Sequence, residues 1–163
     1  MGGGKSGGAK WLCAVLAAWV LVACQDPYEA GLQAFDSGDW PTAITRLKRV
    51  DPFHLHHRDA QDLIRQSIYN AGVDAFDTAQ WTTALSYLKR VKESDPNFAT
   101  ARDYIGASFY ELAVQALDGG DFQEALRLSN IVRSTCSRYQ LARELAHEAQ
   151  QLASGRHADA TSL

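Results

Sequence analysis

Cysteine, proline and surplus positive charge are all scarce in this sequence. The three Cys among 163 residues have neither the paired spacing of a zinc site nor the even count of a disulfide framework. The formal net charge of −3, from 16 basic and 19 acidic side chains, leaves no excess of cations for a phosphate backbone. We therefore expect no nucleic-acid binding. A hydrophobic content of 46% is too apolar for a disordered chain and too polar for a protein with several membrane spans.

Long apolar runs are missing as well. A transmembrane helix needs roughly 20 apolar residues, whereas the uncharged stretch Trp11–Ala23 near the N-terminus has only thirteen. This stretch follows a segment that carries Lys5 and Lys10 and no acid. A basic segment followed by a short apolar run is the layout of a secretory signal.

The apolar stretch ends in Leu21-Val22-Ala23-Cys24, which resembles the lipobox of bacterial lipoproteins. The resemblance implies that the chain is cut before Cys24 and that this residue is acylated. Residues 1–23 are thus expected to be a lipoprotein signal peptide, and residues 24–26 a lipidated Cys with a short tether. Gln25 after the Cys resembles the sorting signal for the Gram-negative outer membrane, on the side that faces the periplasm. A plain signal peptide, or an uncleaved anchor with an incidental Cys, is the alternative.

The rest of the chain repeats itself at a constant interval of about 41 residues, a length typical of repeat proteins. Aromatic, small, acidic and aliphatic positions all recur in three copies. Examples are Tyr28/Tyr69/Tyr110, Gly31/Gly72/Ala113, Asp36/Asp77/Asp118, Trp40/Trp81/Phe122, Ala43/Ala84/Ala125, Val50/Val91/Val132 and Ala60/Ala101/Ala142. Since one offset holds through so many apolar positions, we interpret the pattern as three structural repeats.

Within each copy the apolar residues have helical spacing, and no alternating strand pattern competes with it. A tight break such as Ser37-Gly38-Asp39-Trp40 divides each copy into two helices. Proline favours the first helical turn, so each of the four prolines is expected near a helix start. Together these signals predict helices over residues 27–37, 41–50, 53–78, 82–93, 96–118, 122–135 and 138–154.

The small residues at three positions of each copy resemble those of the tetratricopeptide repeat. They are Gly31/Gly72/Ala113, Ala34/Ala75/Ala116 and Ala43/Ala84/Ala125, and Leu47, Leu88 and Asp95-Pro96 extend the match. Ser129 departs from the family pattern, and so does the period, which exceeds that of the family by about two helical turns. The resemblance covers residues 27–136. It implies an all-α fold, an α-solenoid of three tetratricopeptide-like helical hairpins plus a C-terminal capping helix, over residues 27–154.

The last predicted helix has the features of a solenoid cap. Ser137 is expected to cap its N-terminus, and Leu141, Leu145, Ala149 and Leu152 to form its apolar stripe. Gly155 is expected to end it, which leaves residues 155–163 as a flexible tail.

Few residues have the spacing of a chemical site. His54, His56 and His57 are weak candidates for metal ligands, and a polar connector between repeats is the favoured interpretation. Cys136 is expected to be buried beside the helix predicted at 122–135. No Ser, Cys or Thr lies in a motif with a base and an orienting group, so we predict neither an enzyme nor a cofactor.

The first helix of each hairpin lines the concave groove in tetratricopeptide proteins. The resemblance therefore implies a partner-binding stripe of tyrosine, aliphatic and aspartate side chains. Its members are Tyr28, Leu32, Asp36, Tyr69, Val73, Asp77, Tyr110, Val114 and Asp118. Such a stripe suits an apolar peptide or helix that carries some Lys or Arg. Packing of the tyrosines inside the repeats is the alternative.

These features predict a membrane-anchored envelope lipoprotein that acts as a protein–protein interaction scaffold and assists the assembly of an envelope complex. The expected partner is another envelope protein, with the membrane bound through Cys24. A metal- or small-ligand-binding envelope protein and a structural subunit of a large membrane complex are the alternatives.

Overall fold

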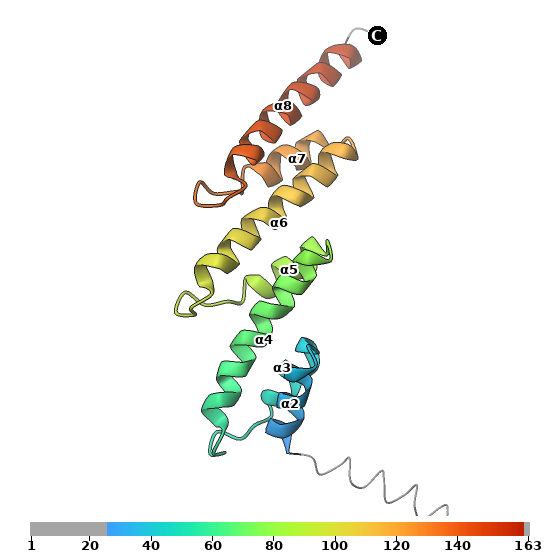
Figure 1. The fold of residues 1–163 in the computed structure, drawn as a ribbon. Helices are drawn as coiled ribbons and strands as arrows, with labels where there is room; N and C mark the ends of the chain where they lie inside the picture. The colour runs from blue at the N-terminus through green and yellow to red at the C-terminus, as the bar shows by residue number, and fades with distance from the viewer. Residues whose placement is uncertain (1–25, 162–163) are drawn as a thin grey trace, which may run out of the picture. The chain divides into compact units, whose positions relative to one another are not determined.

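The computed structural model describes residues 26–161 and the side chains of residues 26–155 (Figure 1). This part of the chain is all α-helical, with seven helices and no strand. The helices are α2 (Pro27–Asp36), α3 (Trp40–Leu47), α4 (His57–Asp77), α5 (Trp81–Leu88), α6 (Phe98–Asp118), α7 (Phe122–Ser129) and α8 (Tyr139–Thr161). The predicted signal peptide and the lipidation site at Cys24 lie outside the described residues.

The helices recur with the period of the sequence. The short helices α3, α5 and α7 are equal in length and begin at Trp40, Trp81 and Phe122, which are equivalent positions of the three copies. The longer helices α2, α4 and α6 end at aspartates with the same spacing. The predicted all-helical fold and the predicted breaks within each copy are therefore confirmed.

One type of turn links the two helices of every copy. The residue after the helix cap has a positive φ, 75° at Gly38, 58° at Ala79 and 74° at Gly120. In the first copy the N–H of Gly38 donates to the carbonyl of Phe35, and the N–H of Asp39 donates to that of Ala34. The later copies repeat both bonds. This pair of bonds is the Schellman motif, which ends a helix by giving its last carbonyls partners.

The structured chain divides into two compact units, with the boundary between Ile64 and Arg65 inside α4. In the first unit α2 packs against α3. Gly31 makes this contact close, because a Cβ at that position would lie 2.5 Å from Cγ of Leu47. Ala34, Ala43, Ile44 and Leu47 are buried here.

In the second unit the same close contact joins α4 and α5, where a Cβ at Gly72 would lie 2.6 Å from Cγ of Leu88. Helix α6 packs against α5, α7 and α8, and α7 packs against α8. The core between α4, α5 and α6 includes Ala75, Ala84, Leu88, Val91 and Ala101. The core around α7 includes Ala113, Ala125, Leu128, Leu145 and Ala149. Ala84 and Ala125 are both fully buried, as expected from the repeat.

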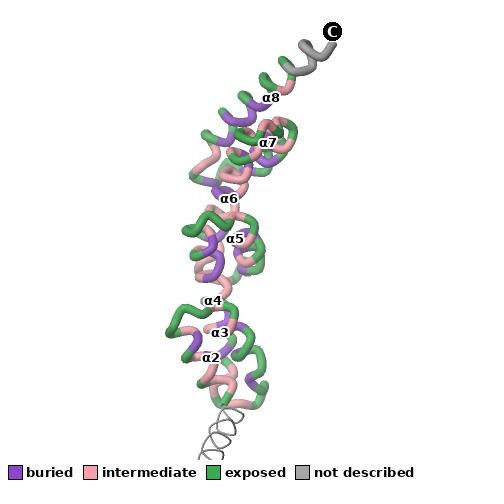
Figure 2. The backbone as a smooth tube through the Cα atoms, turned by 90° about the vertical axis from the view of Figure 1, so that its right-hand side faces the viewer, coloured by how far each residue is buried: buried purple, intermediate pink, exposed green. Residues whose placement is uncertain are grey.

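The second helix of each copy is shorter than the sequence predicts. Helix α3 ends at Leu47 because the following N–H groups of Arg49 and Val50 donate three residues back, to Arg46 and Leu47. Such bonds tighten the chain into a 3₁₀-like turn, which buries Val50. The equivalent bonds and buried valines follow α5 and α7. In Figure 2 the residues of these connectors are mostly exposed, whereas the buried residues lie chiefly on the helices.

Two prolines do not start helices as predicted. Pro52 lies in the connector before α4, which begins at His57, and Pro96 lies two residues before α6. In both connectors bonds between a carbonyl and the N–H three residues later form successive turns before the helix begins.

The prediction for the last helix needs three corrections. Ser137 does not stand directly before α8, which begins at Tyr139, and its hydroxyl donates to Asp103 Oδ2 on α6. The buried stripe of α8 consists of Ala142, Leu145, Ala146 and Ala149, whereas Leu141 and Leu152 are exposed. The helix continues past Gly155, where the sequence predicts its end.

No helix among residues 26–161 combines the length and the apolar character needed to cross a membrane.

Candidate functional site

The predicted partner-binding stripe begins in the first unit with Tyr28, Leu32 and Asp36. Tyr28 is half-buried and stacks on the ring of His56, with 4.6 Å between ring centroids and 14° between planes. Burial raises the pKa of the Tyr28 hydroxyl, and the charges of Asp59 and Glu29 add to the rise. Leu32 is half-buried, and Asp36 is exposed at the end of α2.

The stripe residues of the second unit are also partly enclosed. Tyr69 packs against the core between α4, α5 and α6, and burial raises the pKa of its hydroxyl, with a smaller effect from Tyr104. Tyr110 packs against the core around α7, with the guanidinium of Arg138 5.5 Å above its ring. The aliphatic members Val73 and Val114 are half-buried, and the aspartates Asp77 and Asp118 are exposed. The tyrosines thus contribute to packing, while the aspartates face solvent.

His54 and His56 of the first connector lie beside different carboxylates, and His57 begins α4. Nε2 of His54 lies 3.3 Å from Asp26 Oδ2, and Nδ1 of His56 lies 3.1 Å from Asp59 Oδ2. Nδ1 of His57 is buried without a hydrogen-bond partner. Within the described part of the chain, no three His, Cys, Asp or Glu side chains lie close enough together to hold a metal ion.

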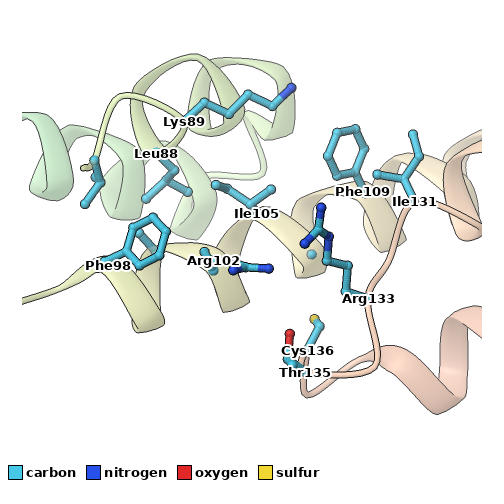
Figure 3. Close-up of a pocket in the computed structure, with 13 residues that line it drawn as sticks. Leu88, Lys89, Phe98, Arg102, Ile105, Phe109, Ile131, Arg133, Thr135 and Cys136 are labelled. Carbon is cyan, nitrogen blue, oxygen red and sulfur yellow. The ribbon is translucent and has the colours of Figure 1, made fainter. Parts of the chain in front are cut away.

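A cleft of about 400 Å³ opens in the second unit, at a place that the sequence did not single out (Figure 3). It lies between the end of α5, the first half of α6 and the connector that follows α7. Its apolar surface comes from Leu88, Val91, Phe98, Ala101, Ile105, Phe109 and Ile131. The size is at the lower end of the range of about 300–1,000 Å³ for ligand pockets.

In the part of the chain that the structure describes, three cations border this apolar surface and no carboxylate lines it. They are Lys89 at the end of α5, Arg102 on α6 and Arg133 on the connector. The ammonium of Lys89 lies 5.0 Å from the centre of the Phe109 ring, and the guanidinium of Arg102 lies 5.7 Å from that of Phe98. Figure 3 shows Arg133 extending from the connector toward the space between Ile105 and Phe109.

A second hollow, of about 540 Å³, shares part of its lining with the cleft. Arg102 and Arg133 line both spaces, and Arg143 of α8 joins them in the second. Among the described residues, no carboxylate lines this second hollow. Among residues 26–155, no acidic side chain pairs with Lys89, Arg102, Arg133 or Arg143. We call these four residues the basic border.

The preceding repeat has an ion pair at the positions that correspond to Gly106 and Cys136. There, Nε of Arg65 on α4 lies 3.2 Å from Oδ1 of Asp95, a carboxylate that is largely buried. One period later the two positions are occupied by Gly106 and Cys136. The thiol packs so closely on α6 that a Cβ at Gly106 would lie 2.5 Å from it. The third copy therefore lacks both the arginine side chain and the carboxylate that lie at this position in the second.

Hydrogen bonds join α6 to the connector before α8, next to Cys136 in the lining of the cleft. Asp103 Oδ1 accepts the backbone N–H of Ser137 at 2.6 Å, and Oδ2 accepts its hydroxyl at 2.9 Å. Burial alone would raise the pKa of Asp103. The hydrogen bonds from Ser137 and Cys136, together with the charge of Arg138, lower the pKa by more than burial raises it, so the pKa lies below its ordinary value of 3.8. Burial is also the main cause that raises the pKa of the Cys136 thiol. Cys136 is buried as predicted, although its closest neighbour is α6 rather than α7.

The basic border joins residues that lie far apart in the sequence, so no local motif marks it. One signal was present in the repeat alignment, where Arg65 and Asp95 both change one period later. Comparison of the chain with protein-family models, with curated proteins and with solved structures finds no match.

Proposed function

We propose that this protein is a lipid-anchored adaptor of the bacterial envelope, built from tetratricopeptide-like hairpins, which docks a segment of another protein in the cleft between α5 and α6. The proposed partner segment carries one or two large apolar side chains flanked by carboxylates. Assembly of an envelope complex is the process that such an adaptor serves.

The hairpin geometry supports the tetratricopeptide-like arrangement. Helices recur with one constant period, and the glycines at Gly31 and Gly72 allow the same close contact with Leu47 and Leu88. Repeat proteins of this kind stack their helical units, and the extended surface of the stack binds partners.

The docking proposal depends on the basic border around the apolar surface of the cleft. Unpaired guanidinium groups are favourable sites for carboxylates, because charge-assisted bonds to them are short and strong. The aromatic and aliphatic surface beneath them stabilises a bound apolar side chain by excluding water. Recognition of acidic motifs by arginine clusters is a recurring mode of peptide binding.

The extent of the basic border favours a peptide over a small anion. The cations bridge two adjoining hollows and come from α5, α6, α8 and a connector. A single carboxylate contacts one or two cations, whereas an extended acidic segment contacts all four.

The aspartates of the predicted stripe have a charge opposite to that of the basic border. Binding of a basic segment there stays a separate prediction.

A binding measurement tests this proposal. The probe is a fluorescein-labelled peptide in which Glu residues flank one Leu and one Phe, and fluorescence anisotropy follows its binding to the full mature chain. Arg133→Glu should weaken binding by about tenfold, or about 1.4 kcal/mol. Higher salt should weaken binding to the parent chain as well, because the contacts are charged and open to solvent.

Arg90→Glu is the matched control. Arg90 is an exposed arginine of the same unit that does not line the cleft, and reversal of its charge should leave the affinity unchanged. Equal losses in both variants would show a nonspecific effect of net charge and would contradict docking in the cleft. If free glutamate binds as tightly as the peptide does, the ligand of the cleft is a small anion and not a protein segment.

A further inference from the structure

The connector between α3 and α4 presents two large apolar side chains to solvent. Phe53 is 98% exposed and Leu55 is 88% exposed, the highest values among the large hydrophobic residues of the described chain. Exposed apolar residues that gather at one place indicate a surface that contacts an apolar partner. The later connectors hold Ser94 and Pro96, and then Thr135 and Ser137, at the same two positions.

The start of the folded chain lies beside this connector. Nε2 of His54 contacts Oδ2 of Asp26 at 3.3 Å, and the ring of His56 stacks on that of Tyr28. In Figure 1 the connector and the first residues of α2 lie at the same end of the first unit. Asp26 is two residues after Cys24, and two residues of extended chain span at most about 7 Å.

The polar backbone of the connector is largely satisfied from within. The N–H of Phe53 donates to Oδ1 of Asp51 at 2.8 Å, and the N–H of His54 donates to the carbonyl of the same residue. The N–H of His56 donates to Nδ1 of His54, and the N–H of His57 donates to the carbonyl of His54. Moving this turn into a poorly hydrated layer therefore exposes few unpaired N–H groups, which is the main cost of placing irregular backbone near lipid.

We propose that Phe53 and Leu55 insert into the interfacial layer of the membrane that holds the acylated Cys24, and that they fix the orientation of the first unit at the bilayer surface. This inference rests on the lipid anchor of the proposed function, and is independent of the cleft. The acyl chains supply attachment, and the two side chains supply a second contact point.

The exposed charges around the connector are nearly balanced. Asp26, Glu29, Asp51 and Asp59 are acidic, and Lys48, Arg49 and Arg58 are basic. Because anionic lipids attract surfaces with a clear excess of Lys and Arg, the surface that fits best is zwitterionic, such as phosphatidylethanolamine or phosphatidylcholine.

Depth-dependent fluorescence quenching tests the insertion. Phe53→Trp keeps an aromatic side chain and adds a reporter, and Ser94→Trp places the same reporter at the equivalent exposed position one period later. The full acylated chain is reconstituted in phosphatidylcholine vesicles whose acyl chains carry bromine, and quenching is compared with that of the parent chain. The reporter at position 53 should be quenched by roughly twice the fraction seen for the parent tryptophans, since interfacial side chains reach about 5–10 Å into the boundary of the acyl region. The reporter at position 94 should add no quenching.

The outcomes separate the inference from the anchor. A parent chain that floats with the vesicles, combined with equal quenching of the two reporters, contradicts the insertion and leaves the anchor intact. A parent chain that does not float, or an intact mass that still begins at Met1, contradicts both. A third outcome would also overturn the insertion. If the reporter at position 53 is not quenched, and sedimentation shows that the parent chain is a dimer whereas Phe53→Ser is not, the connector contacts a second copy of the chain.

Discussion

Ala79 occupies a backbone conformation that the other two repeats give to glycine. Its φ is 58°, close to the values of 75° at Gly38 and 74° at Gly120. An L-residue with a Cβ in this region is strained by about 1–2 kcal/mol. The turn nevertheless makes the same two hydrogen bonds in all three copies, so the repeat imposes the conformation on whichever residue stands there.

Replacement of this residue is the first prediction at the residue scale. Ala79→Gly relieves the strain but adds freedom to the unfolded chain, so we expect a net gain of about 0.5–1 kcal/mol in the free energy of unfolding. Gly38→Ala should lose a similar amount, because its positive φ would strain the new side chain, whose Cβ would meet only Cζ2 of Trp40, at 3.8 Å. Urea unfolding followed by circular dichroism measures both. If both substitutions changed the free energy of unfolding in the same direction, the positive φ would not be the cause of the strain.

Asp103 is a single residue whose carboxylate joins α6 to the connector before α8. Burial alone would raise its pKa, but the hydrogen bonds, chiefly those from Ser137, outweigh burial and bring the pKa below the ordinary 3.8. A carboxyl with a lowered folded pKa stabilises the fold above its unfolded pKa, and this stabilisation is lost as the pH falls through the folded pKa. The contribution is therefore complete above about pH 5 and disappears as the pH falls below the folded value.

The second prediction follows from this sign. Asp103→Asn should lower the free energy of unfolding at pH 7 and should flatten its decline between about pH 5 and pH 2. Guanidinium unfolding at a series of pH values, compared with the parent chain, measures both effects. An unchanged slope would show that the Ser137 contact does not hold the carboxylate in solution. Asp118→Asn is a suitable control, because Asp118 is exposed and none of the described interactions involves it.

At the scale of the elements, each hairpin depends on a small residue facing a large one. Gly72 faces Leu88 in the second copy, as Gly31 faces Leu47 in the first. The third copy has Ala113 and Ser129 at these positions, so a larger first residue accompanies a smaller second one. The two positions are thus adjusted to each other, as expected for close-packed helices.

Gly72→Ala tests this adjustment. The new Cβ would lie 2.6 Å from Cγ of Leu88, so the helices must move apart. We expect a loss of about 1–3 kcal/mol in the free energy of unfolding. In a Leu88→Ala background the same change should cost clearly less, because the colliding atoms are absent. Equal costs in the two backgrounds, measured by a double-mutant cycle, would show that the two residues do not interact.

Helix lengths mark the limit of what periodicity predicts. The apolar spacing of Ile44, Leu47 and Val50 is helical, and it predicted one helix over 41–50. The chain instead tightens after Leu47 and still buries Val50. A 3₁₀-like turn and an α-helix both bring residues three apart to one side, so the pattern could not distinguish them. The turns depend on neighbours within a few residues, and the buried alanines recur with the period of the sequence, so both were predictable.

At the scale of the whole molecule, the candidate sites differ in how far the sequence reveals them. Cys24 belongs to a short contiguous motif, whereas the basic border depends on the packing of α5, α6, α8 and a connector. The positions of its cations follow from side-chain directions that no local pattern encodes. The changes from Arg65 to Gly106 and from Asp95 to Cys136 were visible in the repeat alignment, but only the structure shows that Gly106 and Cys136 line the cleft.

In the proposed function, the cleft between α5 and α6 docks an acidic segment of another protein. A photo-crosslinking benzoylphenylalanine that replaces Ile131 in the full-length chain, in the cells that express it, tests this directly, and mass spectrometry identifies the crosslinked peptide. Arg90, which stands one period earlier outside the cleft, receives the same group as control. We predict that position 131, and not position 90, captures one polypeptide at a segment where Asp or Glu flanks a Leu, Phe or similar side chain, and that Arg133→Glu abolishes the product. Crosslinks to lipid alone, to a segment without acidic residues, or in equal amount from both positions would contradict the claim.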